Sequence, residues 1–288
     1  MSWNDALKVE HVNKTYPGFS LTDVCFELPK GSIMGLVGEN GAGKSTIIKI
    51  LLGLVQKDSG EVQILGERDL EKNKYVKEDI GVVFDEINFY ETLTPVKVEK
   101  ICKNAYKNWD SAAYASYMEQ FSLPKDKEIK TFSKGMQVKL CLAVAMSHQA
   151  KLLLLDEPTS GLDPIVREEL LDIFLEFVQD EEHAVLLSSH ITTDLEKIAD
   201  YITFLHKGNV IFSTSKDELI YHYGLVKCKE ALFRQMDRGD ILAYRKLDYS
   251  YEVLVADREM AGRKYPEAVI DPATIEEIML LYVKGEKP

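Results

Sequence analysis

Gly38-Glu39-Asn40-Gly41-Ala42-Gly43-Lys44-Ser45-Thr46 sets the architecture of this chain, because it joins two segments of different hydrophobic periodicity. The apolar run Ile33 to Val37 before it predicts a buried strand, and helix-spaced apolar residues extend from Ser45 to Leu54. In the pattern G-x-x-x-x-G-K-[ST], glycines let successive backbone N–H groups converge on an anion at the start of a helix. The stretch therefore predicts a phosphate-binding loop, with Lys44 at the β- and γ-phosphates and the Ser45 hydroxyl on Mg2+.

The composition describes a globular chain with reduced thiols. Of its 288 residues 45% are hydrophobic, and 35 basic against 47 acidic residues give a net charge of -12. This charge argues against attraction of the whole protein to nucleic acid or anionic lipid, so no nucleic-acid partner is expected. Cys25, Cys102, Cys141 and Cys228 form no C-x-x-C pair, which indicates free thiols in a cytoplasm. No apolar run approaches the ~20 residues of a membrane helix, so any membrane role is expected to be peripheral.

A second chemical motif follows the leucine run Leu152 to Leu155, which continues into Asp156-Glu157-Pro158. Such a run predicts a central parallel strand that is buried on both faces and ends in carboxylates at the ligand-binding edge. Adjacent carboxylates repel one another, and a cation near Lys44 removes that conflict. Asp156 is therefore expected to hold Mg2+ through water, and Glu157 to act as the general base.

The remaining pattern predicts an α/β fold with a helical insertion. Strands are expected at 8–13, 21–28, 61–65, 80–84, 184–187, 201–205, 210–212 and 251–255. Helical signals dominate from Pro95 to about Phe121, and helices are expected at 134–147, 164–178 and from Asp271-Pro272 through Val283. Ser133 is the expected N-cap of the helix that begins at Lys134. The strand at 184–187 leads to Ser188-Ser189-His190, which places His190 at the same sheet edge as Asp156 and Glu157.

In this order and around a helical insert, these motifs resemble the nucleotide-binding subunit of an ATP-binding cassette (ABC) transporter over most of residues 7–215. The resemblance implies a P-loop NTPase core with an antiparallel β subdomain, a helical subdomain at about 87–147, and a cassette that ends near residue 215. Residues 216–288 would form a small accessory domain of unknown role. On the matching positions it implies an adenine-stacking aromatic at Tyr16, a signature helix starting Ser133-Lys134-Gly135-Met136, a D-loop from Ser160 to Asp163, and a switch histidine at His190.

The same resemblance implies an ATPase that works as a pair. Two cassettes, either two copies of this chain or this chain and a paralogue, would enclose two ATP molecules and Mg2+ head to tail. They would drive a separate integral membrane permease from the cytoplasmic face of a bacterial membrane. The Ser-Lys-Gly-Met form of the signature resembles that of cassettes in bacterial drug, bacitracin and sodium exporters, which favours export.

The chain departs from the family pattern in two places, the signature motif and Asp85. The usual Leu-Ser-Gly-Gly-Gln is Phe132-Ser133-Lys134-Gly135-Met136 here, which keeps Ser133 and Gly135. Asp85 takes the place of the glutamine that touches Mg2+ and senses the membrane subunit. An aspartate can hold Mg2+ directly, but without a neutralising partner it repels the γ-phosphate.

Aromatic residues follow Asp85 in the polar stretch Asn88-Phe89-Tyr90-Glu91-Thr92-Leu93. Exposed aromatics on a loop often mark a binding surface, so the permease is predicted to dock near Ile87 to Val96. The alternative is that Phe89 and Tyr90 pack under the helical insert.

Two other functions stay open. One is a soluble ABC-type ATPase that acts on a ribosome or DNA, although such proteins typically carry two cassettes or a long coiled-coil insertion. The other is an ATP sensor that closes without turnover. Lys44, Glu157 and His190 argue against the sensor, whereas Asp85 keeps it open.

Overall fold

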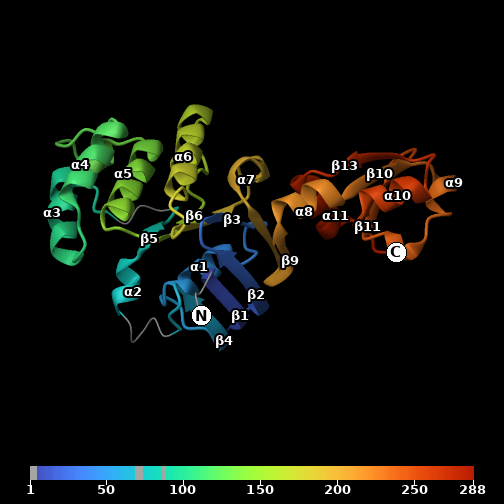
Figure 1. Cartoon of the computed structure of the whole chain (residues 1–288), viewed down its shortest axis with the longest axis horizontal. Coiled ribbons are helices and arrows are strands. Elements are labelled where there is room, and N and C mark those ends of the chain that lie inside the picture. Colours follow the sequence, from blue (N-terminus) through green and yellow to red (C-terminus); the bar gives the residue numbers. More distant parts are fainter. Residues whose placement is uncertain (1–4, 69–73, 86–88) are drawn as a thin grey trace. The chain divides into compact units, whose positions relative to one another are not determined.

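The computed structural model describes residues 5–68, 74–85 and 89–288 and divides into two compact units (Figure 1). The first unit ends at Ser213 and the second begins at Thr214. Ile87, where the predicted helical subdomain begins, and the neighbouring Asn88 lie outside the described residues.

A six-stranded sheet in the order β5-β6-β7-β3-β8-β9 forms the centre of the first unit. Its strands are β3 (Ser32–Val37), β5 (Ile80–Val83), β6 (Leu152–Asp156), β7 (Ala184–Ser189), β8 (Tyr201–His206) and β9 (Asn209–Ser215). The pairs β5–β6, β6–β7, β7–β3 and β3–β8 are parallel, so their carboxyl ends meet at one edge. All five side chains of β6 are buried, as expected for a strand covered on both faces.

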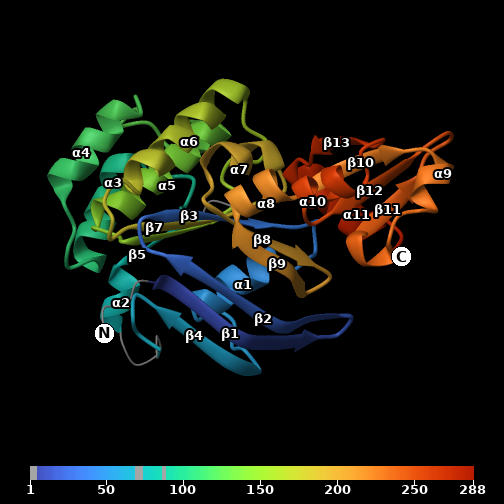
Figure 2. The ribbon, with the colours of Figure 1, turned by 45° about the vertical axis from the view of Figure 1, so that its right-hand side comes forward.

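A smaller antiparallel sheet, β2-β1-β4, lies on the opposite side of α1 from the six-stranded sheet (Figure 2). It consists of β1 (Asp5–Tyr16), β2 (Phe19–Pro29) and β4 (Ser59–Ile64), and α1 spans Lys44–Leu51. Ile47 and Ile48 on α1 belong to one buried cluster with residues of both sheets. The predicted α/β P-loop fold with an antiparallel β subdomain is confirmed.

The phosphate-loop helix is shorter than its apolar spacing predicted. It ends at Leu51, and Gly53 follows with φ +67°, a left-handed conformation that terminates the helix. Leu54 is 65% exposed and lies outside the core. The expectation that the helix extends to Leu54 was wrong, because a local glycine stop overrides continued periodicity.

The helical part of the first unit contains α3 (Pro95–Ala105), α4 (Ser111–Gln120), the 3-10 turn η1 (Ile129–Thr131) and α5 (Lys134–Ser147). The stretch from Pro95 to about Phe121, where helical signals were expected to dominate, contains two helices, α3 and α4. Tyr106 leaves helical geometry with ψ 133°, and its ring stacks on His148 at 4.2 Å. Asp110 then starts α4 by accepting hydrogen bonds from the backbone N–H groups of Ala112 and Ala113.

Three further helices accompany the sheet of the first unit: α2 (Lys74–Glu78), α6 (Pro164–Phe177) and α7 (Thr192–Ile198). Asp163 caps α6 and Pro164 occupies its first position, a combination that favours helix initiation. In the residues that the structure describes, no helix is both long enough and apolar enough to cross a membrane.

The second unit has its own antiparallel sheet, in the order β11-β12-β10-β13. Its elements are α8 (Lys216–His222), β10 (Gly224–Cys228), α9 (Glu230–Phe233), the 3-10 turn η2 (Arg238–Asp240), β11 (Ala243–Lys246), β12 (Tyr251–Val255), α10 (Arg258–Lys264), β13 (Val269–Pro272) and α11 (Ile275–Lys284). A separate buried cluster includes Val226, Met236 and Val253.

The start of the last helix corrects a sequence prediction. Asp271 and Pro272 belong to β13, where Asp271 is paired with Leu225, and do not open α11. Thr274 is the N-cap instead, and its side chain and that of Glu277 form a reciprocal capping box.

Candidate nucleotide-binding site

The predicted phosphate loop connects the end of β3 to the start of α1. Gly41 has φ +82° and Gly43 has φ +114°, conformations that strain other residues. Gly38 is needed for a different reason: a Cβ there would lie 2.4 Å from the Leu205 carbonyl oxygen at the end of β8. Glu39 and Asn40 are exposed, and the Ala42 N–H donates to the Glu39 carbonyl across the turn. The loop therefore rests against the sheet through Gly38 and turns through the other two glycines.

Lys44 is the first residue of α1 and is buried, with 6% exposure. Its Nζ donates to the Gly38 carbonyl oxygen at 2.7 Å, so the loop surrounds its own ammonium group. The same Nζ lies 3.2 Å from Glu157 Oε1. Ser45 is exposed and Thr46 is half-buried directly after it, which leaves the Ser45 hydroxyl accessible to a ligand.

Asp156 and Glu157 lie where β6 ends, and Ser188 of the neighbouring β7 contacts both. Ser188 Oγ donates to Asp156 Oδ1 at 2.7 Å, and the Glu157 backbone N–H donates to Ser188 Oγ at 3.0 Å. Ser188 therefore fixes the positions of both acidic residues. Sequence reasoning placed Ser188 at this edge but gave it no role, because the side-by-side register of β6 and β7 is not visible in the sequence.

Glu157 connects the two sides of the site. Its Oε1 contacts Lys44, and its Oε2 lies 2.7 Å from His190 Nδ1. Glu157 also has φ +52°, which is uncommon for a residue with a side chain and is typical of functional sites. The three residues predicted to be catalytic, far apart in sequence, therefore form one chain of contacts: Lys44, Glu157, His190.

The predicted D-loop follows directly. The Ser160 backbone N–H donates to the Glu157 carbonyl, and Asp163 accepts hydrogen bonds from the N–H groups of Ile165 and Val166 as the N-cap of α6. Ser160 is half-buried and Asp163 is exposed. In this structure the Asp163 side chain therefore stabilises the start of α6.

The predicted signature residues begin α5. Ser133 Oγ accepts a hydrogen bond from the Met136 N–H, which caps the helix. Gly135 is buried, and a Cβ there would lie 2.7 Å from Val166 Cγ1, so Gly135 permits close packing of α5 on α6. Within the described part of the chain, no hydrogen bond or ion pair joins these residues to the phosphate loop of the same chain.

Tyr16 ends β1, and its ring is 37% exposed. Lys14 Nζ lies 5.4 Å from the centre of that ring, within the range of a cation–π contact. A partly exposed aromatic ring at this position is available for stacking.

The donor atoms at the sheet edge fit Mg2+, which prefers hard oxygen ligands. The accessible Ser45 hydroxyl and the Asp156 carboxylate provide two such groups. Asp85, the third predicted metal ligand, is exposed, and its Oδ1 lies 2.9 Å from Lys134 Nζ. Its participation therefore requires this ion pair to open.

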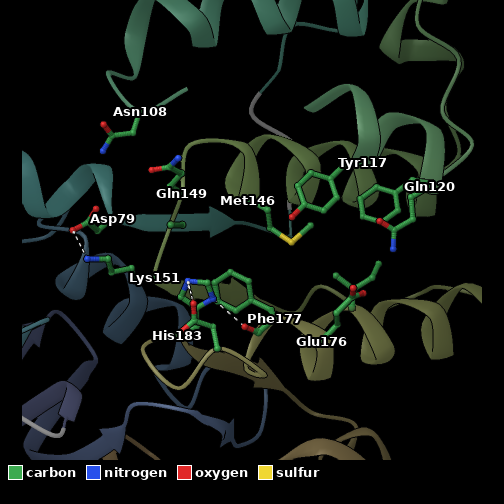
Figure 3. A pocket seen from close by; sticks show the side chains of 14 residues that line it. Asp79, Asn108, Tyr117, Gln120, Met146, Gln149, Lys151, Glu176, Phe177 and His183 are labelled. Atoms are coloured by element: carbon green, nitrogen blue, oxygen red, sulfur yellow. Dashed lines mark hydrogen bonds and ion pairs between the residues drawn. The ribbon is translucent and has the colours of Figure 1, made fainter. Parts of the chain in front are cut away.

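A cavity of about 560 Å3 lies elsewhere, at the amino ends of the parallel strands (Figure 3). Asp79, Lys151 and His183, which stand just before β5, β6 and β7, line it. Tyr117 of α4 and Glu176 of α6 line its other sides. Because the phosphate loop follows the carboxyl end of β3, this cavity is distinct from the predicted nucleotide site.

A glycine-rich loop before α1, an acidic pair after β6 and an imidazole after β7 together define a P-loop nucleoside-triphosphate-binding protein. The profile of the family described as "ABC transporter" matches residues 21–160. The lantibiotic transport ATP-binding protein SrtF of Streptococcus pyogenes is 36% identical over 217 residues, which cover 73% of this chain and 91% of SrtF. The chain belongs to the ABC transporter family of ATP-binding proteins and is an ATP-binding transport ATPase.

Two other comparisons extend this result. The linearmycin resistance ATP-binding protein LnrL of Bacillus subtilis is 29% identical over 296 residues, which cover 98% of this chain and 94% of LnrL. The alignment with LnrL thus includes the second unit. A solved structure described as an ATP-binding subunit of an ABC transporter superposes with a TM-score of 0.68 at 29% identity, covering 74% of this chain and 91% of that chain.

Proposed function

We propose that this chain hydrolyses ATP as one member of a pair of cassettes and drives export by a separate integral membrane permease. The observation that carries this proposal is the contact chain Lys44, Glu157, His190 at the carboxyl edge of the central sheet. The second cassette is another copy of this chain or a paralogue. Residues 1–215 form the catalytic cassette in this proposal, and residues 216–288 form an accessory domain.

The residues divide the chemistry of ATP hydrolysis between them. When the phosphates bind, the Lys44 ammonium turns from Glu157 Oε1 to the phosphate oxygens, which frees that carboxylate oxygen. Glu157 then accepts a proton from the attacking water, and His190 holds the carboxylate through its contact with Oε2. Ser45 and Asp156 would hold Mg2+, which neutralises phosphate charge when it is bound.

The signature residues act across the pair. Among the residues that the structure describes, no hydrogen bond or ion pair links the N-terminus of α5 to the phosphate loop of the same chain, and the positive end of this helix suits an anion. In the proposed pair this anion is the γ-phosphate held by the other cassette. A two-fold arrangement lets both cassettes use the same surface.

Export is favoured by the relatives' names, which describe lantibiotic transport for SrtF and linearmycin resistance for LnrL. The cassette would then sit peripherally at the cytoplasmic face of the membrane. The partner would be a polytopic permease that carries the cargo.

A small apolar pocket in the first unit fits the permease contact. It measures about 160 Å3 and is lined by Ile80, Val82, Phe84, Phe89, Cys102, Tyr106, Cys141, Val144, Ala145 and His148. Burial raises the pKa of the Cys102 thiol to about 11 and that of the Cys141 thiol to about 12, and lowers the pKa of His148. These groups are therefore neutral at pH 7, and the pocket suits apolar side chains of a cytoplasmic permease segment.

The predicted aromatic pair lies beside this pocket. Phe89 is half-buried and lines it, whereas Tyr90 is 82% exposed. Of the two alternatives, packing under the helical part fits Phe89, and an exposed binding residue fits Tyr90.

Purification of the tagged chain from its native host in mild detergent tests this function. We expect a polytopic membrane protein to copurify, and to be lost when Phe89 and Tyr90 are replaced by alanine. Tyr249→Ala is the matched control, because Tyr249 is a 94% exposed tyrosine in the second unit. Recovery without any membrane protein, or with ribosomes, would contradict the transporter function.

A further inference from the structure

Lys134 and Asp85, two of the positions at which this chain departs from its family's pattern, contact one another. Lys134 Nζ lies 2.9 Å from Asp85 Oδ1 in an ion pair. Asp85 follows β5, and Lys134 is the first residue of α5, so the pair joins a loop of the central sheet to the signature helix. Each departure therefore has its charge balanced by the other.

The N-terminus of α5 explains why Lys134 needs an anion. A cation in the first turn of a helix is unfavourable, because the helix dipole places positive partial charge there. The first turn of α5 contains no acidic residue that could compensate. Asp85 provides the missing negative charge from a position 49 residues earlier in the chain.

Lys134 also lies beside the loop that follows the acidic pair. Its Nζ is 3.8 Å from the position a Cβ would take at Gly161, which lies between Ser160 and Asp163. The ammonium group is thus placed between the loop after β5 and the loop after β6. Both loops leave the carboxyl edge of the sheet, where the phosphate loop also lies.

The Lys134–Asp85 pair is suited to exchange its partners. The side chains are 40% and 52% exposed, and an exposed ion pair of this kind contributes little to stability. A triphosphate offers Lys134 more negative charge than one carboxylate does. An anion of that kind at the N-terminus of α5 would also interact with the positive end of the helix.

We propose that Lys134 and Asp85 form a switch that controls ATP-dependent pairing of two chains. In the separate chain, Asp85 holds the Lys134 ammonium. In the pair, the triphosphate bound to the other chain takes the ammonium over, and the Asp85 carboxylate is released. Lys134 is then a phosphate-binding residue for the partner's ATP, and Asp85 competes with that ATP. This inference rests on the proposed pairing of cassettes.

Pairing can be measured on the full chain in a Glu157→Gln background, which blocks turnover. Sedimentation is followed against ATP concentration with EDTA present, so that a metal-binding role of Asp85 does not contribute. Asp85→Asn removes the competitor, so the ATP concentration for half-maximal pairing should fall about two- to five-fold, the range that an exposed ion pair can account for. Lys134→Gln should raise that concentration.

The double variant separates a switch from two independent effects. In the Lys134→Gln background, Asp85→Asn should lower the ATP concentration for half-maximal pairing less than it does beside lysine, because no ammonium remains to be released and only the repulsion between Asp85 and phosphate is removed. Lys134→Arg keeps the cation and should preserve the effect of Asp85→Asn. Glu169→Gln is the matched control. Glu169 on α6 forms an ion pair with Lys139 on α5, the helix that also carries Lys134, and its substitution should leave the pairing of two chains unchanged.

The outcomes distinguish the switch from the function on which it rests. If the Glu157→Gln chain does not pair with itself at any ATP concentration, pairing of two copies of this chain and the switch that controls it are both overturned. If it pairs but Asp85→Asn has no effect, or has the same effect with Gln at position 134, only the switch is overturned.

Discussion

Glu157 shows most clearly how single residues establish the site. Its carboxylate contacts Lys44 on one side and His190 on the other, and its backbone has the uncommon φ of +52°. Ser188 holds the Glu157 backbone N–H. These contacts direct the carboxylate toward the phosphate loop, which is where a general base for attack on a bound phosphate must lie.

Replacing Glu157 by glutamine tests that role. The amide keeps the size of the side chain but cannot accept the proton, so steady-state ATP turnover should fall by about 100-fold or more, the scale of general-base catalysis. ATP affinity, measured by calorimetry, should change little. Glu169→Gln, which removes an exposed carboxylate on α6, should keep wild-type turnover. Near-normal turnover of the Glu157 variant would exclude it as the base.

At the residue scale, the sequence was informative where a short motif and a strand end coincide. The phosphate loop, Asp156, Glu157 and His190 each follow a buried strand, so their meeting at one edge could be predicted. The bridging role of Ser188 and the Lys134–Asp85 pair could not. Both depend on how segments tens of residues apart lie beside each other, and no local pattern contains that information.

At the scale of elements, the sequence placed some helix boundaries correctly and missed others. α5 begins after Ser133 as expected, because an N-cap is a local hydrogen-bonding signal. Between Pro95 and about Phe121 the sequence indicated helical structure without placing the break between α3 and α4, although Asp110 is also a capping residue. At that break, the Tyr106 backbone is extended and its ring stacks on His148. His148 lies at the end of α5, so this is a tertiary contact.

His148 makes that contact dependent on pH. It is 2% exposed, and its Nδ1 lies 2.9 Å from the Glu78 carbonyl oxygen. Burial lowers the pKa of His148 below its ordinary value of 6.5, and the hydrogen bond to Glu78 opposes this only in part. The folded chain therefore favours neutral His148 more strongly than the unfolded chain does.

The sign of the effect follows from proton binding. Below pH 6.5 the unfolded chain binds a proton at His148 that the folded chain resists, so stability falls as the pH falls from 6.5 toward the lower folded pKa. The loss is at most about 1.4 kcal/mol per pH unit. His148→Phe keeps a ring against Tyr106 but cannot be protonated.

Melting temperatures of the first unit between pH 7.5 and 5.5 check this prediction. The His148→Phe variant should lose less stability on acidification than the wild type. His222→Gln, at an exposed histidine of the second unit, should leave the pH dependence of that transition unchanged. A difference between wild type and His148→Phe that is the same at every pH would contradict the prediction.

At the scale of the whole molecule, the sequence indicated a large α/β cassette more clearly than the fold of the rest. The motifs that identify the cassette lie in the first unit, and they imply its parallel sheet. The sequence contained no comparable motif for the second unit's strand order, β11-β12-β10-β13, because that order depends on pairing between strands such as β10 and β13. Only β12 was predicted, since Tyr251 to Val255 alternates clearly.

Each unit has its own sheet and its own buried cluster, so each should unfold in a transition of its own. Leu254 in β12 and Leu186 in β7 are both completely buried and allow matched truncations. Leu→Ala in a core costs about 2–5 kcal/mol. That cost is comparable with the whole stability of a unit of the second unit's size, about 3–5 kcal/mol.

Leu254→Ala should therefore abolish or strongly lower the transition of the second unit and leave ATP binding by the first unit intact. Leu186→Ala should lower the transition of the first unit and weaken ATP binding, because β7 carries Ser188 and leads to His190. Calorimetric unfolding with and without ATP distinguishes the units, since ATP should stabilise only the transition of the unit that binds it. A single transition that both substitutions lower equally would show that the two units unfold together, and residues 214–288 would then be part of the cooperative structure of the cassette.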